Sequence, residues 1–206
     1  DALRLGRAVF DTVTWPEHLA DFSRQVGQVA EHVGNAFDQL AAASTDDKGV
    51  FKAYRALGQR TRALEALYPI AQMLPPVSRF FLDAGQRDDE NLHKRLQDAD
   101  GTRENVGVMH AANAKGTRGG FSMYVPEYYD EGTPCPLIVA LHGGSGHGRD
   151  FLWTWLATAR SCGAILVSPT ARGDTWSLMG PDIDSSNLDQ IVGLASEQWN
   201  IDSDRL

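Results

Sequence analysis

The residues of this chain that could do chemistry form a glycine-rich turn, His142-Gly-Gly-Ser-Gly-His-Gly148, directly after the apolar residues 137–141. A short apolar run bounded by turn residues is typical of a buried β-strand. Four glycines within six residues let the backbone bend with its amides open to a ligand. Such amides can hold a phosphate or stabilise the oxyanion of an acyl-transfer reaction.

A phosphate site would need further residues at fixed spacings. Gly143 and Gly148 have the glycine spacing of a P-loop, but Arg149 and Asp150 stand where that motif has Lys followed by Ser or Thr. The dinucleotide motif G-x-G-x-x-G also fails, because its last glycine would fall on Arg149 or Phe151. A nucleotide-binding protein that uses the glycine turn is therefore kept only as an alternative.

The oxyanion interpretation is favoured by the residues around the turn. His142-Gly143-Gly144 after an apolar strand resembles the turn that α/β-hydrolases carry after their third strand. Residues 121–126 resemble the preceding strand, and residues 165–170 resemble the fourth strand with its proline. Residues 200–206 resemble the segment before the nucleophile strand in carboxylesterase/phospholipase-like and polyhydroxybutyrate-depolymerase-like esterases. The resemblance covers residues 105–206.

This resemblance implies a mixed α/β fold, the N-terminal part of an α/β-hydrolase sheet preceded by a helical region. It also implies a serine esterase that cleaves carboxylic esters through an acyl-enzyme. The backbone N–H of Gly144, with Ser145 as second choice, would contribute to the oxyanion hole. His142 and Gly143 would support the turn, and Trp176 would line the acyl or alcohol pocket.

The resemblance places the rest of the catalytic machinery elsewhere. The family's nucleophile elbow would come within about ten residues of Arg205, followed by the acid and the base. We therefore expect nucleophile, acid and base outside this chain, which alone would be inactive. Ser145 departs from G-x-S-x-G because His147 stands in place of the last glycine. A non-catalytic α/β-hydrolase-like binding protein is the second alternative.

No cofactor and no metal are expected. Asp182 and Asp184 are interpreted as solvated charges of a loop or helix entry. Asp150 is expected to cap a helix, and His147 to face solvent. Ser186-x-x-Asp189 resembles a capping box.

The chain is expected to contain a helical region, residues 1–83, a charged linker, residues 84–105, and the first half of an α/β-hydrolase domain, residues 106–206. Apolar residues recur every three or four positions in the first region. In the last region, short apolar runs alternate with helical patterns, which favours βα units. The expected elements there are a hairpin of residues 106–109 and 121–125, strands 137–141 and 164–168, and helices 150–161 and 187–199.

Composition restricts the partners. The chain has 206 residues and a formal net charge of -8, so a nucleic-acid partner is not expected. No apolar run approaches the roughly 20 residues of a membrane-spanning helix. The expected partners are a small-molecule or lipid-like ester, the C-terminal remainder of the same protein, and a second copy through the N-terminal helices.

Cysteine usage bears on localisation. The chain has two cysteines, Cys135 and Cys162, each just before a strand-like run. Two reduced, buried thiols are expected, and a bridge between them is the alternative. The first case slightly favours the cytoplasm, and the second would fit an exported protein; the sequence leaves the location open.

Overall fold

The computed structural model describes residues 2–43, 49–177 and 180–205, and it divides into two compact units, Asp1–Phe80 and Phe81–Leu206. Each unit is described by itself below. None of the helices within these ranges combines the length and the apolar character that a bilayer crossing requires.

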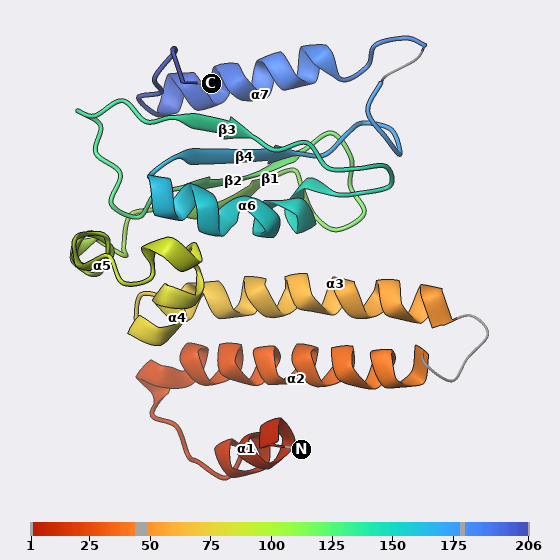
Figure 1. Ribbon diagram of the computed structural model, residues 1–206, viewed down its shortest axis with the longest axis vertical. Helices are drawn as coiled ribbons and strands as arrows, with labels where there is room; N and C mark the ends of the chain where they lie inside the picture. Colours follow the sequence, from red (N-terminus) through yellow and green to blue (C-terminus); the bar gives the residue numbers. More distant parts are fainter. Residues whose placement is uncertain (1, 44–48, 178–179, 206) are drawn as a thin grey trace. The chain divides into compact units, whose positions relative to one another are not determined.

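The first unit is helical, as expected. Its α-helices are α1 (Ala2–Phe10), α2 (Ala20–Ala43), α3 (Gly49–Leu67) and α4 (Pro75–Phe80). α2 and α3 pack side by side as a helical hairpin (Figure 1). α2 buries only Gly27 among its described residues, so its apolar side chains are at most half-buried.

The second unit contains a mixed four-stranded sheet. Its strands are β1 (Gly107–Ala111), β2 (Phe121–Val125), β3 (Leu137–Val139) and β4 (Ile165–Pro169), in the order β1-β2-β4-β3. β1 and β2 form the predicted hairpin. β3 and β4 are parallel, with Val139 opposite Val167, whereas β2 and β4 are antiparallel, with Met123 opposite Val167. The predicted mixed α/β class is therefore confirmed.

Two helices cover the two faces of this sheet. α6 (Gly148–Cys162) connects β3 to β4 on one side, and α7 (Ser185–Gln198) lies on the other (Figure 1). Side chains alternate between the faces of a strand, so Met123 and Val125 pack with the apolar face of α7. The contacting residues from α7 and its end are Ile191, Ala195 and Trp199.

The α6 face of the sheet encloses a buried ion pair. Arg160 Nε of α6 donates to Glu127 Oε1 over 3.0 Å, and the two side chains are 1% and 4% exposed. The hydroxyl of Tyr124 donates to the other carboxylate oxygen, Oε2, over 2.7 Å. Sequence patterns did not indicate this pair, because its residues lie in different elements.

Residues 84–105 are not a linker, which corrects the sequence-based expectation. They belong to the second unit and contain α5 (Glu90–Asp98). Asp89 caps this helix, its side chain accepting from the N–H groups of Asn91 and Leu92. Leu92 and Leu96 are buried with Leu82. Two leucines four residues apart are enough to anchor so short a helix, although the surrounding charge hides them.

Both expected caps differ in the structure. α6 begins two residues earlier than predicted, and the side chain of half-buried His147, not Asp150, accepts from the N–H of Arg149. His147 Nε2 also contacts the carbonyl oxygen of Thr117 over 2.9 Å, so this residue does not simply face solvent. α7 begins after Asp184, so Ser186 is inside the helix and cannot form the predicted capping box.

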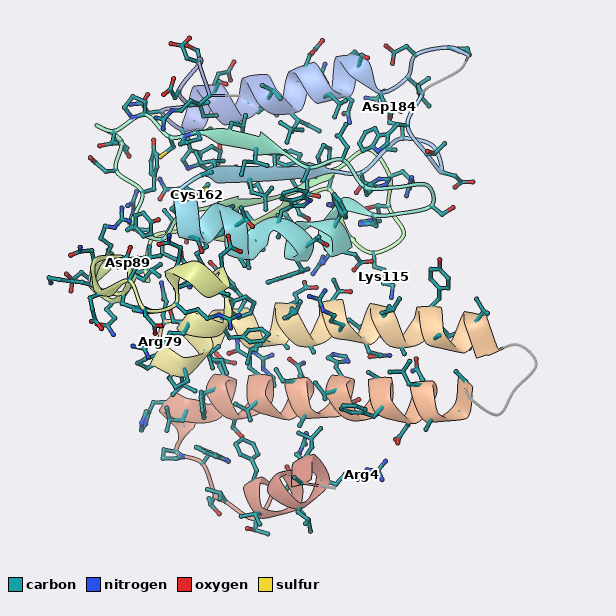
Figure 2. The ribbon with its side chains drawn as sticks, viewed as in Figure 1. Arg4, Arg79, Asp89, Lys115, Cys162 and Asp184 are labelled. Carbon is teal, nitrogen blue, oxygen red and sulfur yellow. The ribbon has the colours of Figure 1, made fainter. Side chains whose placement is uncertain are left out.

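The two cysteines carry free thiols. Cys135 is half-buried, and burial raises the pKa of its thiol. Cys162, at the end of α6, is exposed rather than buried as expected (Figure 2).

Candidate functional site

The glycine turn lies between β3 and α6, at the carboxyl end of β3 (Figure 1). The N–H of Gly146 donates to the carbonyl of Gly143 over 3.0 Å, so Gly144 and Ser145 are the central residues of a β-turn. Ser145 has a φ of 56°, a region that normally favours glycine. Such a strained residue persists only where surrounding contacts hold it.

Three amides of the turn, those of Ser145, Gly146 and Gly148, are already engaged. The N–H of Ser145 donates to the carbonyl of Asp174 over 2.7 Å, which corrects the expectation that Ser145 could be an oxyanion donor. The N–H of Gly148 donates to Thr170 Oγ1 over 2.9 Å. In contrast, the exposed Gly143 and Gly144 have no acceptor for their N–H groups among the described residues.

This distribution of amides bears on the choice between phosphate and oxyanion. A phosphate cradle uses several successive N–H groups that converge on one anion. Here the N–H groups of Ser145, Gly146 and Gly148 point to protein acceptors, and Arg149 donates to His147. The adjacent N–H groups of Gly143 and Gly144 fit a single oxygen atom better than a phosphate group.

His142 supports the turn as a neutral ring. It is 3% exposed, and its Nε2 accepts from the N–H of Ala171 over 3.1 Å. The proton therefore resides on Nδ1, which donates to the carbonyl of Gly143 over 2.7 Å. Burial lowers the pKa of His142; the Nδ1 hydrogen bond opposes this shift, and the charge of Arg118 adds to it. With both nitrogens engaged, His142 is not placed to act as a base.

The contacts of Gly143 affect the neighbouring amide of Gly144. The Gly143 carbonyl accepts from both His142 Nδ1 and the Gly146 N–H. This carbonyl belongs to the same peptide group as the Gly144 N–H. Hydrogen bonds accepted by the oxygen polarise that group, so they strengthen the N–H as a donor and fix its direction.

The loop of residues 171–177, which follows β4, lies beside the turn. The indole N–H of Trp176 donates to the carbonyl of His142 over 2.7 Å, and the two ring centroids are 4.9 Å apart. Trp176 is half-buried against the turn, so its immediate role is packing. Its predicted contact with substrate stays a prediction.

No sequence pattern indicated Arg118, which contacts both the glycine turn and the 171–177 loop. Its Nη1 donates to the carbonyl of Gly146 over 2.7 Å, and its Nη2 donates to the carbonyl of Gly173. Arg118 lies in a glycine-rich hairpin connection where a charged residue is ordinarily solvated. Only the folded contacts distinguish it from Lys115, three positions earlier and exposed.

One Ser–His hydrogen bond joins the neighbouring strands β1 and β2. His110 Nδ1 and Ser122 Oγ are 2.7 Å apart, a pairing that can activate a nucleophile. Ser122 is fully buried, however, and out of reach of a substrate. The side-chain amide of Asn113 joins Ser122 Oγ at 2.8 Å to Thr170 Oγ1 at 2.7 Å. This polar chain therefore supports the Gly148 N–H bonded to Thr170.

Asp184 anchors the 171–177 loop and is not a solvated charge, which corrects the expectation (Figure 2). Its carboxylate accepts from the N–H of Arg172 over 2.8 Å, and from the N–H and the hydroxyl of Ser177, each over 2.9 Å. Burial alone would raise the pKa of Asp184, but these hydrogen bonds outweigh it and lower the pKa below 3.8. Asp182 is exposed and accepts from the N–H groups of Asp184 and Ser185.

Replacing Asp184 with asparagine is expected to lower the free energy of unfolding at pH 7 by about 2 kcal/mol. The asparagine NH₂ would face donors that now face a carboxylate oxygen. Because the folded-state pKa is depressed, this stability is present above pH 3.8 and lost as the pH falls through the folded value. Urea unfolding at several pH values should show the two proteins converging at low pH. Asp189→Asn, on the exposed side of α7, is the control with no expected change.

Comparison with protein-family models, with curated proteins and with solved structures found no match for this chain.

Proposed function

We propose that the glycine turn is the oxyanion half of a serine hydrolase that cleaves carboxylic esters. The observation that carries this proposal is the N–H of the exposed residue Gly144, which has no acceptor among the described residues and follows the carboxyl end of β3. Its peptide group is held by two hydrogen bonds while Ser145 and Gly146 donate elsewhere. Oxyanion holes use such fixed donors, because they need no rearrangement when charge develops on the substrate oxygen.

The pairing of the last described residues supports a position for the nucleophile next to the glycine turn. Residues 200–205 run beside the start of β3: Ile201 forms a parallel bridge with Cys135, and the N–H of Leu137 donates to the carbonyl of Arg205 over 3.0 Å. A strand continuing in this direction would be a parallel neighbour of β3, about 4.8 Å away. Its carboxyl end would then lie beside the glycine turn, where an α/β-hydrolase carries its nucleophile elbow.

In the proposed reaction, this chain contributes one oxyanion donor, and the elbow contributes the nucleophile and the second donor. The serine Oγ would pass its proton to the base outside this chain and attack the ester carbonyl carbon, and the carbonyl oxygen would become an oxyanion bound by the Gly144 N–H. The second donor would be the N–H of the residue after the nucleophile. Collapse of the tetrahedral intermediate releases the alkoxide, which takes the proton from the protonated base and leaves as the alcohol. Water then hydrolyses the acyl-enzyme and restores the serine.

The test begins with the reading frame that encodes this chain. We expect a G-x-S-x-G elbow within about twenty residues after Leu206. The full-length product should be labelled by a fluorophosphonate probe and should hydrolyse p-nitrophenyl acetate or octanoate. An elbow position without Ser, Cys or Asp, or a full-length protein that neither labels nor hydrolyses these esters, would instead favour a non-catalytic binding protein. Heat released on titration with ATP or NAD would favour the nucleotide alternative.

A further inference from the structure

We propose that Arg118 is the positioning residue of the oxyanion turn. Its guanidinium joins the glycine turn to the 171–177 loop and so fixes the direction of the Gly144 N–H. The inference rests on the proposed function of the turn, but its structural part can be tested without that function. The contacts that carry it are the bonds from Nη1 to the Gly146 carbonyl and from Nη2 to the Gly173 carbonyl.

The backbone places Arg118 between the loops. The N–H of Gly119 donates to the carbonyl of Thr170 over 3.1 Å, and the N–H of Thr170 donates to the carbonyl of Gly120 over 2.8 Å. These bonds continue the pairing of β2 with β4 beyond the ends of both strands. Arg118 directly precedes these paired residues. Its side chain therefore begins where the hairpin connection and the 171–177 loop separate.

The chemistry of the side chain suits this role. A guanidinium has five N–H donors in a rigid planar arrangement, whereas a lysine ammonium is a single compact charge. One arginine can therefore bridge two carbonyl groups of different loops. Arg118 Nε is buried without an acceptor among the described residues, so the side chain gives up hydration to make these two contacts.

Loss of Arg118 would loosen a turn that already contains a strained residue. Ser145, at φ 56°, is held by its single N–H bond to the carbonyl of Asp174, and Gly173 precedes that acceptor directly. Without the bond from Arg118 to Gly173, both partners of the Ser145–Asp174 bond can move. The Gly144 N–H would then lose its fixed direction, and a displacement of about 1 Å can cost 100-fold in rate.

The experiment compares Arg118→Met, Arg118→Lys and Lys115→Met in the full-length protein. Lys115→Met is the matched control, because it removes a positive charge from the same connection at an exposed position (Figure 2). Amide hydrogen exchange at Ser145 and Gly146 would be followed by NMR on protein labelled with ¹⁵N-serine and ¹⁵N-glycine. We expect exchange to be about tenfold faster or more in both Arg118 variants and unchanged in Lys115→Met.

Ester hydrolysis is the second measurement. In Arg118→Met we expect kcat to fall by about 100-fold with KM nearly unchanged, because the lost geometry matters in the transition state. The kcat of Arg118→Lys should fall less, since an ammonium keeps the positive charge and N–H donors but lacks the rigid planar arrangement of the guanidinium. Unchanged exchange in a folded Arg118→Lys protein would overturn the proposal, as would an equal loss of kcat in Lys115→Met. The two proposals can fail separately. If exchange is faster in the Arg118 variants but the full-length wild-type protein has no esterase activity, the positioning role is supported and the proposed function is rejected.

Discussion

Replacing Glu127 with alanine is expected to lower the free energy of unfolding by about 3 to 5 kcal/mol. The substitution removes the carboxylate that pairs with the buried guanidinium of Arg160, and it also removes the oxygen that accepts from the Tyr124 hydroxyl. A buried charge without its partner keeps the full cost of its desolvation. The loss should therefore exceed the value of an ordinary hydrogen bond.

Urea unfolding followed by tryptophan fluorescence would measure this effect. The matched control is Asp98→Ala, which breaks the exposed pair of Lys94 and Asp98 on α5 and should cost less than about 1 kcal/mol. The double variant Glu127→Leu/Arg160→Leu should be less destabilised than Glu127→Ala, because it leaves no buried charge. A loss below about 1 kcal/mol in Glu127→Ala would contradict the assignment of a buried, coupled pair.

Local patterns were sufficient to predict most of the second unit. The alternation around Met123, the apolar run after Pro136 and the glycines after Leu141 predicted strands and a turn that the structure contains. They did not predict that β2 pairs with β4 in the antiparallel sense, because strand order depends on contacts between distant residues. Local charge also concealed α5, whose leucines gain their burial from another part of the chain.

In the candidate site, too, local patterns predicted some features, whereas contacts between distant residues could not be predicted. The positions of His142, Gly143 and Gly144 at the end of a strand followed from the sequence alone. The engagement of the Ser145 N–H by the carbonyl of Asp174 did not, because that bond joins two loops that meet only in the fold. The contacts of Arg118 are of the same kind, and both of its acceptors are backbone carbonyls, which have no sequence signature.

Replacing Gly144 with proline is expected to reduce the kcat of ester hydrolysis in the full-length protein by about 10²- to 10³-fold. Proline removes the N–H proposed to bind the oxyanion. Gly144 is the second residue of a β-turn, a position that proline often occupies, and the turn can therefore persist. No acceptor among the described residues loses a hydrogen bond, so the free energy of unfolding should change little.

Gly144→Ala is the control for Gly144→Pro, because it replaces the glycine but keeps the N–H group. Its φ is not positive, and an added Cβ would meet only Thr175 Oγ1, at 3.9 Å, so alanine fits with its N–H retained. We expect activity close to wild type for alanine and the large loss for proline alone. Equal losses in both variants would mean that the turn needs glycine for its shape, and full activity in Gly144→Pro would remove this amide from the oxyanion hole. Because Ser145 and Gly146 already donate elsewhere, the role would then pass to the N–H of Gly143.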